Sequence, residues 1–459
     1  MPVIIGLSSI IGLSCHDAAT TTSVKEQKDE HMIRLITIDP GHFHAALLQK
    51  SMYPGVDSTV HVYAPEGPEL QAHLNLVKQY NTRSEAPTAW KEEVFSGPNF
   101  LQKMFAEKAG NVVVIAGNNQ KKTSYIKQAV DSGFNVLADK PMAINTADFN
   151  ALLEAFASAE KNKVLLYDIM TERYEINSIL QKEFMHMPEV FGELEKGSAA
   201  NPAIIKQSVH HFFKSVSGKP LVRPSWFFDV SQQGDGIVDV TTHVIDLIQW
   251  SCFPGEALDY KKDINMLSAK RWATALTPSQ FKQVTQKDTY PDFLKKDLKD
   301  SLLEVFSNGE MNYTIKGVHA KVSVTWNFQA PEGGGDTHFS ILRGSKASLI
   351  IRQGKEQQYK PVLYIEPIMN NAGVGNTLQE ALKKTDQLYP GVTLKKNGKG
   401  WEVVIPEKYR VSHEEHFAQV TAKFLQYLKE GKLPDWEVPN MIAKYYTTTQ
   451  ALQMALEGK

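Results

Sequence analysis

The sequence predicts an α/β protein of two domains, in which a parallel, doubly wound sheet precedes an α+β region with a large, mostly antiparallel sheet. Its 459 residues exceed what one hydrophobic core usually supports. Short apolar strands alternate with helical segments over residues 32–168, which is typical of a parallel sheet. After Asp168 the strands become longer and take a two-residue period, which indicates a mixed or antiparallel sheet over 169–459.

The first region contains five short apolar segments that we expect to be strands. The runs LITI, VVVIAG and VLLY lack polar alternation, because parallel strands covered by helices on both faces are apolar throughout. The expected strands are 33–38, 59–63, 111–116, 135–137 and 163–167. Helical periodicity follows Phe43 and covers 70–80, 123–132 and 146–162.

The second region begins with an expected helix at 175–183 and closes with two more, at 413–430 and 440–456. Between them, two-period strands are expected at 319–328, 337–342, 347–352 and 361–366. A charged segment over 260–299 lacks strand patterning, and we expect it to be a strand-poor insert.

The charge balance excludes one class of partner. Fifty basic residues against 51 acidic residues leave a formal net charge of -1, and no long block of one sign occurs. A general nucleic-acid or polyanion binder needs such a block, so no nucleic-acid partner is expected and the ligand should be a small molecule.

The first fifteen residues are apolar and small, and they end at Cys15. They are too short to span a bilayer, and Gly12-Leu13-Ser14-Cys15 resembles a bacterial lipobox, in which the cysteine becomes a lipid-carrying N-terminus. Residues 16–31 are polar and suit a flexible tether. This pattern predicts a periplasmic or outer-membrane-associated lipoprotein of a Gram-negative bacterium, the alternative being a disordered N-terminal tail.

The stretch DPGHFHAAL, which starts at Asp39, follows the first strand in the way a dinucleotide-binding loop does. Of the GxGxxG glycines it keeps the central one, Gly41, which lets a pyrophosphate approach the backbone beside His42 and Phe43. An ordinary strand-to-helix turn is the alternative. Glu66, after the second strand, could hold the adenosine ribose or be a solvated loop charge. No arginine stands there for a 2'-phosphate, which favours NAD over NADP.

Polar residues also follow the fourth and fifth strands, at the edge of the sheet where ligands of doubly wound folds bind. IAGNN places Asn118 and Asn119 where they could lie along the nicotinamide ribose. VLADKPM places Asp139 and Lys140 at the next strand exit, with Pro141 fixing the direction of the chain.

The segment GDGIVDVTTHVIDLIQW, residues 234–250, spaces Asp239, His243 and Asp246 by four and three residues. On a helix this spacing places the three side chains on one face, where a carboxylate could orient an imidazole for proton transfer. An amphipathic helix with a capped histidine is the alternative. His210, His211 and His243 lack the usual zinc-ligand spacing, so no metal site is expected.

The four motifs, in this order, resemble the Gfo/Idh/MocA oxidoreductases. The resemblance implies a Rossmann domain that holds NAD(P) and a C-terminal domain whose open sheet mediates homo-oligomers, dimers or tetramers. It implies that Lys140 contacts the substrate hydroxyl and the nicotinamide, with Asp139 replacing the usual glutamate before it. It further implies that His243 is the general base and that Asp239 positions it.

Candidate sugar contacts lie in the second region. Sugars favour planar hydrogen-bond donors and an aromatic face, which several side chains after Asp168 provide. They are Arg173, Tyr174, His210, His211, Arg223 and Trp226.

Together these features predict an NAD-dependent oxidoreductase that acts on a secondary hydroxyl of a sugar or glycoside, such as that on carbon 3. A tightly retained cofactor is expected, because no soluble NAD pool exists outside the cytoplasm. Two alternatives remain: an NAD-dependent glycosidase of the same fold that oxidises its substrate transiently, and a sugar-binding lipoprotein without catalysis.

Overall fold

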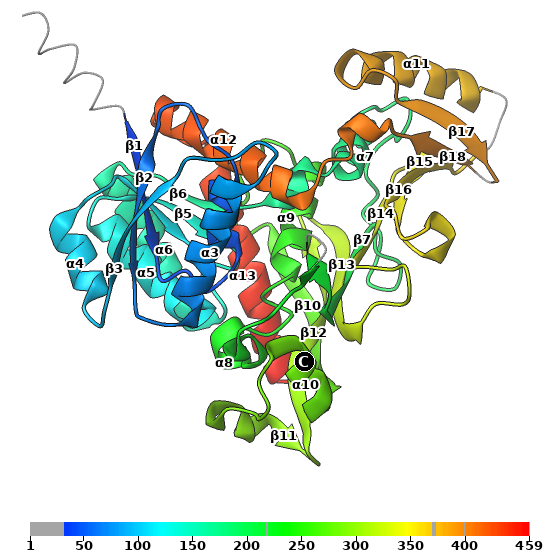
Figure 1. Ribbon diagram of the computed structural model, residues 1–459. Helices are drawn as coiled ribbons and strands as arrows, with labels where there is room; N and C mark the ends of the chain where they lie inside the picture. The colour runs from blue at the N-terminus through cyan, green and yellow to red at the C-terminus, as the bar shows by residue number, and fades with distance from the viewer. Residues whose placement is uncertain (1–31, 217–218, 370–372, 399, 459) are drawn as a thin grey trace, which may run out of the picture.

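The computed structural model describes residues 32–216, 219–369, 373–398 and 400–458. The expected signal, Cys15 and the tether over 16–31 lie outside the described residues. Figure 1 shows a parallel sheet with helices around it and, beside it, a larger sheet from the second half of the chain. Among the described helices, none is both long and apolar enough to cross a bilayer.

The N-terminal sheet has six parallel strands in the order β3-β2-β1-β4-β5-β6, which confirms the predicted parallel, doubly wound sheet. Its strands are β1 (Ile33–Ile38), β2 (Val56–Ala64), β3 (Lys91–Ser96), β4 (Val112–Ile115), β5 (Asn135–Asp139) and β6 (Leu166–Ile169). The connecting helices are α2 (His44–Leu47), η1 (Leu48–Lys50), α3 (Pro68–Thr82), α4 (Phe100–Glu107), α5 (Asn119–Asp131) and α6 (Thr146–Asn162). The sequence did not predict β3, because this edge strand is charged and largely exposed.

The second sheet is mostly antiparallel, as predicted, with one parallel pair between β13 and β7. Its main path runs β10-β12-β13-β7-β14-β15-β16-β18-β17. The long strand β13 alternates buried and partly exposed residues, so one face of the sheet packs inward on α7 and α9. The strands are β7 (Ile204–Phe213), β10 (Ile264–Leu276), β11 (Leu298–Lys299), β12 (Leu302–Ile315), β13 (Val318–Gln329), β14 (Thr337–Arg343), β15 (Ala347–Arg352), β16 (Val362–Pro367), β17 (Thr393–Asn397) and β18 (Gly400–Val404). Assembly into a homo-oligomer stays a prediction.

The prediction that residues 260–299 are poor in strands is wrong for 264–276. Strand β10 occupies 264–276 and pairs with β12 at the edge of the sheet. Two register shifts, at Met266/Ser268 and Trp272/Thr274, break its two-residue period, so its sequence lacks clean alternation. The remainder forms α10 (Pro278–Thr285), η4 (Asp292–Asp297) and the short β11.

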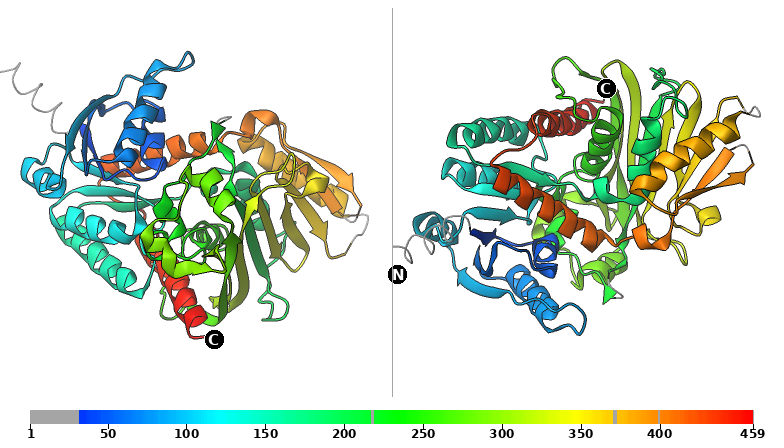
Figure 2. Two further views of the ribbon diagram at one scale, coloured as in Figure 1. Left: turned by 60° about the horizontal axis from the view of Figure 1, so that its bottom comes forward. Right: turned by 90° about the horizontal axis from the view of Figure 1, so that it is seen from above.

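Helices complete the second half, and some of them return to the first domain. They are η2 (Thr171–Tyr174), α7 (Ile176–Met185), η3 (Ser225–Phe228), α8 (Val230–Gln233), α9 (Thr241–Cys252), α11 (Val374–Leu388), α12 (His413–Glu430) and α13 (Glu437–Leu456). Phe417 and Phe424 of α12 are buried in the core of the parallel sheet. Tyr445 of α13 packs in that same core, whereas Leu452 packs in the core of the second sheet. Figure 2 shows α12 lying along the first domain.

A fully buried ion cluster fixes α13 and α9 beside β6. The Lys444 ammonium lies 2.7 Å from Asp168 Oδ2 and 2.9 Å from Asp246 Oδ1, and its side chain has no exposed surface. Arg173 donates from Nε and Nη2 to the Asp246 carboxylate and from Nη1 to the Glu437 carboxylate. Because these charges are shielded from water, they must remain paired, and they hold the two domains in one relative position.

Candidate active site

A cavity of about 950 Å³ lies where the two domains meet. Loops after β1, β4 and β5 line it from the parallel sheet, and β7, η3, α9 and the start of α12 line it from the other side. In a doubly wound fold, ligands bind at the carboxyl ends of the strands where the strand order reverses. Here that point lies between β1 and β4.

Two glycines meet at that point. A Cβ added to Gly117, after β4, would lie 2.3 Å from the Asp39 carbonyl oxygen and 3.1 Å from the Gly41 nitrogen. Only glycine permits so close a backbone approach. Gly41 has space for a Cβ, but that atom would lie 3.4 Å from the Trp226 ring, which covers the loop from the second domain. Gly117 belongs to the IAGNN segment, but nothing in the sequence indicates that its backbone contacts the loop after β1.

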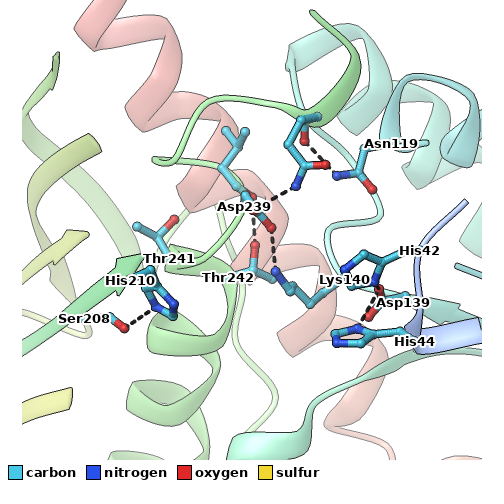
Figure 3. A network of polar contacts seen from close by, with 12 residues as sticks. His42, His44, Asn119, Asp139, Lys140, Ser208, His210, Asp239, Thr241 and Thr242 are labelled. Atoms are coloured by element: carbon cyan, nitrogen blue, oxygen red, sulfur yellow. Dashed lines mark hydrogen bonds and ion pairs between the residues drawn. The ribbon is translucent and has the colours of Figure 1, made fainter. Parts of the chain in front are cut away.

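The carboxylate of Asp139, at the end of β5, lies between His42 of the loop after β1 and His44 at the start of α2 (Figure 3). Asp139 Oδ2 is 3.0 Å from His44 Nδ1 and 3.3 Å from His42 Nδ1. Burial lowers the pKa of both imidazoles, well below the ordinary value for His44. Burial alone would raise the pKa of Asp139, but the two histidines outweigh it and hold that pKa well below its usual range.

Lys140 leads a chain of polar contacts between the domains (Figure 3). Its Nζ lies 2.5 Å from Asp239 Oδ1, and Asp239 Oδ2 accepts a hydrogen bond of 3.0 Å from Gln233 Nε2. Asn119 Nδ2 in turn donates to the Gln233 carbonyl oxygen at 2.7 Å. Burial would raise the pKa of Asp239, but the Lys140 ammonium lowers it, so the carboxylate is ionised. Lys140 is therefore held in one place with its ammonium at the cavity wall.

His243 lies on α9 and lines the same cavity as Lys140 and Asp239. Its Nδ1 is buried and finds no hydrogen-bond partner in the described part of the chain. Burial, and then the nearby Lys140 charge, lower its pKa well below the ordinary value, so the imidazole is neutral near pH 7. A neutral imidazole in a cavity, beside a fixed ammonium, can accept a proton from a bound hydroxyl.

The predicted row of Asp239, His243 and Asp246 on one helix face is wrong. Helix α9 begins at Thr241, so Asp239 lies in the turn before it, where it reaches Lys140. Asp246 is buried against Lys444 and its carboxylate is occupied by that ion cluster. The Asp246 carboxylate therefore does not orient the His243 imidazole.

The far wall of the cavity carries a second charged cluster, centred on Asp336. Its carboxylate lies 3.2 Å from His210 Nδ1, 3.1 Å from His211 Nδ1 and 2.6 Å from Lys214 Nζ. Burial opposes the charge on Asp336, but the hydrogen bonds from the two histidines outweigh it and hold its pKa far below the usual range. Trp326 stacks on the His210 ring with centroids 5.1 Å apart. The wall thus offers hydrogen-bonding groups beside an aromatic face.

The family models cover both halves of the chain. Residues 18–167 match the model described as "Oxidoreductase family, NAD-binding Rossmann fold" (GFO_IDH_MocA), and residues 180–456 match "Putative oxidoreductase C terminal domain". A crystal structure described as "a putative oxidoreductase from Parabacteroides merdae" is 57% identical, covers 94% of this chain and 98% of its own, and superimposes with a TM-score of 0.92. The chain belongs to the Gfo/Idh/MocA oxidoreductase family.

More distant structures share the fold of this Gfo/Idh/MocA protein. Levoglucosan dehydrogenase in complex with NADH is 12% identical, covers 93% of this chain and 97% of its own, and has a TM-score of 0.60. A 3-ketoreductase from Actinomadura kijaniata in complex with NADP is 14% identical, covers 92% and 98%, and has a TM-score of 0.57. Among curated proteins, none matches this sequence.

Several candidate residues lie around the cavity as the sequence suggested. Those that line it are His42, Phe43, Asn119, Asp139, Lys140, His210, His211, Arg223, Trp226, Asp239 and His243. Arg223, however, donates to the backbone carbonyl oxygens of Phe212 and His211, so it braces β7.

Besides Gly41, which lies under the Trp226 ring, four candidates lie outside the cavity lining. Arg173 is held in the buried ion cluster and Tyr174 packs against the core of the first domain, so neither side chain lines the cavity. Asn118 caps α5 and donates to Gln232, which ties the domains together outside the cavity lining. Glu66 is exposed two residues beyond the end of β2, also outside that lining.

Sequence reasoning missed other members of the site in this Gfo/Idh/MocA protein. Glu172 lines the cavity, and burial together with the neighbouring Glu175 raises its pKa to about 7. Lys122 lies behind the cavity wall, buried on α5, and its Nζ donates to the Lys140 carbonyl oxygen at 3.4 Å. Burial lowers its pKa to about 8. No local pattern marks either residue, because each acts through neighbours distant in sequence.

Proposed function

We propose that this protein is an NAD-dependent oxidoreductase that oxidises or reduces a secondary hydroxyl of a sugar or glycoside, with carbon 3 as the expected position. One observation supports the proposal above all: the Lys140–Asp239 pair and the neutral His243 line one cavity with the glycine-containing loops after β1 and β4. These groups suit a secondary alcohol, whose hydroxyl proton would pass to a base while the hydride on its carbinol carbon would pass to a bound nicotinamide.

The residues present fit a dinucleotide. The contact between Gly117 and the first loop leaves backbone rather than side chains at the switch point, and Phe43, Asn119 and Lys140 lie around it in the cavity. The ring of Trp226 covers Gly41 and would limit exit on that side. We favour NAD over NADP because no arginine follows β2.

In the proposed reaction, the bound nicotinamide would supply the hydride acceptor or donor. Lys140 would donate a hydrogen bond to the reacting oxygen and stabilise negative charge on it, while Asp239 holds the ammonium in position. The neutral His243 would take the hydroxyl proton during oxidation and return it during reduction. The surrounding loops and helices would exclude water from the reacting groups.

A sugar or glycoside suits the far wall. The stacked rings of His210 and Trp326 line it, and Asp336 with Lys214 offers hydrogen-bonding groups of both kinds. Sugar-processing enzymes among the distant structural relatives agree with this choice, although their likeness establishes the fold alone.

We further propose that the protein is a periplasmic or outer-membrane-associated lipoprotein anchored through Cys15. Support comes from the sequence Gly12-Leu13-Ser14-Cys15 and the apolar residues before it. In that compartment the enzyme must retain its NAD and reoxidise it on a second substrate. Metabolic labelling with radioactive palmitate, compared between wild type and Cys15→Ala, tests the anchor.

Release of the cofactor tests the proposed function. The full chain is purified, denatured, and the supernatant examined by absorbance and mass spectrometry for NAD(H) and NADP(H). We expect about one NAD(H) per chain, and a panel of sugars and glycosides should then change the nicotinamide absorbance in wild type but not in Lys140→Ala or His243→Ala.

Two other results would replace the proposal. Sugar binding with no nucleotide and no turnover would select the non-catalytic binder. Release of an aglycone with no net change in nicotinamide absorbance would select the NAD-dependent glycosidase.

A further inference from the structure

We propose that His42, His44 and Asp139 form a binding site for one divalent transition-metal ion of the zinc type, open to the active-site cavity. The site lies on the loop after β1 and at the end of β5, beside Lys140. Neither the predicted redox chemistry nor the family models assign it.

The spacing of the three side chains fits metal coordination. Their ligand atoms all lie within 4.8 Å of one another. Asp139 Oδ2 is 3.0 Å from His44 Nδ1 and 3.3 Å from His42 Nδ1. Two ligands bound at about 2.0–2.1 Å in tetrahedral geometry lie roughly 3.3 Å apart, so both separations match the edges of a coordination polyhedron.

Hydrogen bonding explains only part of the cluster. His44 Nδ1 lies within hydrogen-bond geometry of Asp139. His42 Nδ1, 3.3 Å from the same carboxylate, is close enough for an ion pair but makes no aligned hydrogen bond within the described residues. A buried polar atom without an aligned hydrogen bond is costly, and a metal ion shared by the two imidazoles and the carboxylate would satisfy it.

The fold holds the ligands in place. His42 and His44 flank Phe43 in a short turn, and their rings are 4.0 Å apart at centroids. Phe417 of α12 packs on the His44 ring at 4.6 Å, and Asp139 is 3% exposed. Rigid ligands of this kind lose little entropy on binding an ion.

Two imidazoles and one carboxylate are a ligand set that zinc and neighbouring first-row metals accept. All three residues line the cavity, so a remaining coordination position would face the space in which substrate and cofactor bind. The ammonium groups of Lys140 and Lys122 lie close enough to lower the pKa of His42, and they oppose a dication. An anionic oxygen in the open position would offset this repulsion.

Metal binding is tested on the full chain after treatment with a chelator and dialysis. Zn²⁺ is titrated by calorimetry, and Co²⁺ by its visible absorption bands, which report nitrogen and oxygen coordination directly. We expect one ion per chain. His44→Ala should weaken Zn²⁺ binding by about 100-fold or more, because losing a group that merely orients a ligand already costs about 10–100-fold.

Asp139→Asn keeps the shape of the side chain and should weaken binding as well, whereas His61→Ala, on β2 and outside the cavity, serves as the matched control and should bind as wild type. Circular dichroism and thermal melting show that each variant is folded. Equal Zn²⁺ affinity in wild type and in a folded His42→Ala/His44→Ala variant would overturn the proposal. So would a wild-type chain that gives no Co²⁺ bands.

The metal measurement is independent of the proposed redox function. Titration needs neither turnover nor bound NAD, and the nucleotide content is recorded for the same preparations. A chain that retains NAD(H) but binds no Zn²⁺ would refute the metal site and leave the oxidoreductase proposal intact. A chain that binds Zn²⁺ but retains no NAD(H) would do the opposite.

Discussion

Lys140→Met tests the central pair of the site, because methionine keeps most of the length of the side chain and removes its charge. In the wild type, the ammonium lies 2.5 Å from Asp239 Oδ1, and the two side chains are 12% and 7% exposed. Removing one partner of a buried pair costs about 3–5 kcal/mol, since the other charge is left unpaired. Asp239 keeps its hydrogen bond from Gln233, so we expect the lower figure, about 3 kcal/mol.

That loss converts to a measurable shift in melting temperature. At about 2.1 cal/mol/K per residue, unfolding 459 residues as one unit changes the entropy by about 1 kcal/mol/K. The expected decrease in Tm is therefore about 3 °C, measured by differential scanning calorimetry. With a sugar substrate, kcat/KM should fall by about 10²–10³-fold, as it does when one charge-stabilising donor is removed from an active site.

A second variant separates stability from catalysis. Lys140→Met combined with Asp239→Asn removes both charges, so Tm should return to within about 1 °C of wild type while turnover stays at the level of the single variant. The reasoning fails if Lys140→Met has the same melting temperature as wild type, or if the double variant regains activity. In the first case the pair is not shielded from water, and in the second Lys140 does not touch the reacting oxygen.

Three further outcomes are expected. The pH profile of kcat/KM should stay level as pH falls past 6.5 and decline only in more acidic solution, since burial and then Lys140 lower the pKa of His243 below that ordinary value; an acid limb at or above pH 6.5 would contradict its role as base. Gly117→Ala places a Cβ 2.3 Å from the Asp39 carbonyl oxygen, so mass spectrometry should find about tenfold less retained nucleotide, and unchanged content would show that this loop does not hold it. Lys444→Met leaves the buried carboxylate of Asp168 without an ion partner and takes one of two cations from Asp246, so it should lower the free energy of unfolding by about 3–5 kcal/mol in calorimetry; a melting temperature equal to that of wild type would argue against a structural role.

The sequence predicted the parallel sheet well, because each of its central strands is a short apolar run next to a helix with clear periodicity. The expected helix at 146–162 matches the bounds of α6. Two edge strands were not predicted: β3 is exposed and charged, and β10 is interrupted by register shifts. The edge strand β6 is apolar and buried and was predicted, whereas β7 and β12, inside the second sheet, were not named.

The site was predicted where residues are adjacent in sequence and missed where the fold brings distant segments together. Lys140 and His243 could be proposed because each lies in a recognisable motif. Asp336 follows three glycines in a loop, and nothing local shows that it meets His210 and His211 of β7. Arg173 has the planar hydrogen-bond donors typical of a sugar contact. Its ion partners on α9 and α13, however, hold it in a buried ion cluster.

The packing of the last two helices bears on how long a cofactor would stay bound. Domains joined by one hinge can open a cleft cheaply, but here α12 buries Phe417 and Phe424 against the parallel sheet, and α13 contributes to both cores. Opening the cavity would expose these side chains, at about 1.5–3 kcal/mol each, and would separate Lys140 from Asp239. A wide opening motion is therefore costly, and exchange must proceed through local movement of loops such as the one that carries Trp226. This packing therefore supports the proposal that the cofactor is kept and recycled and does not leave after each turnover.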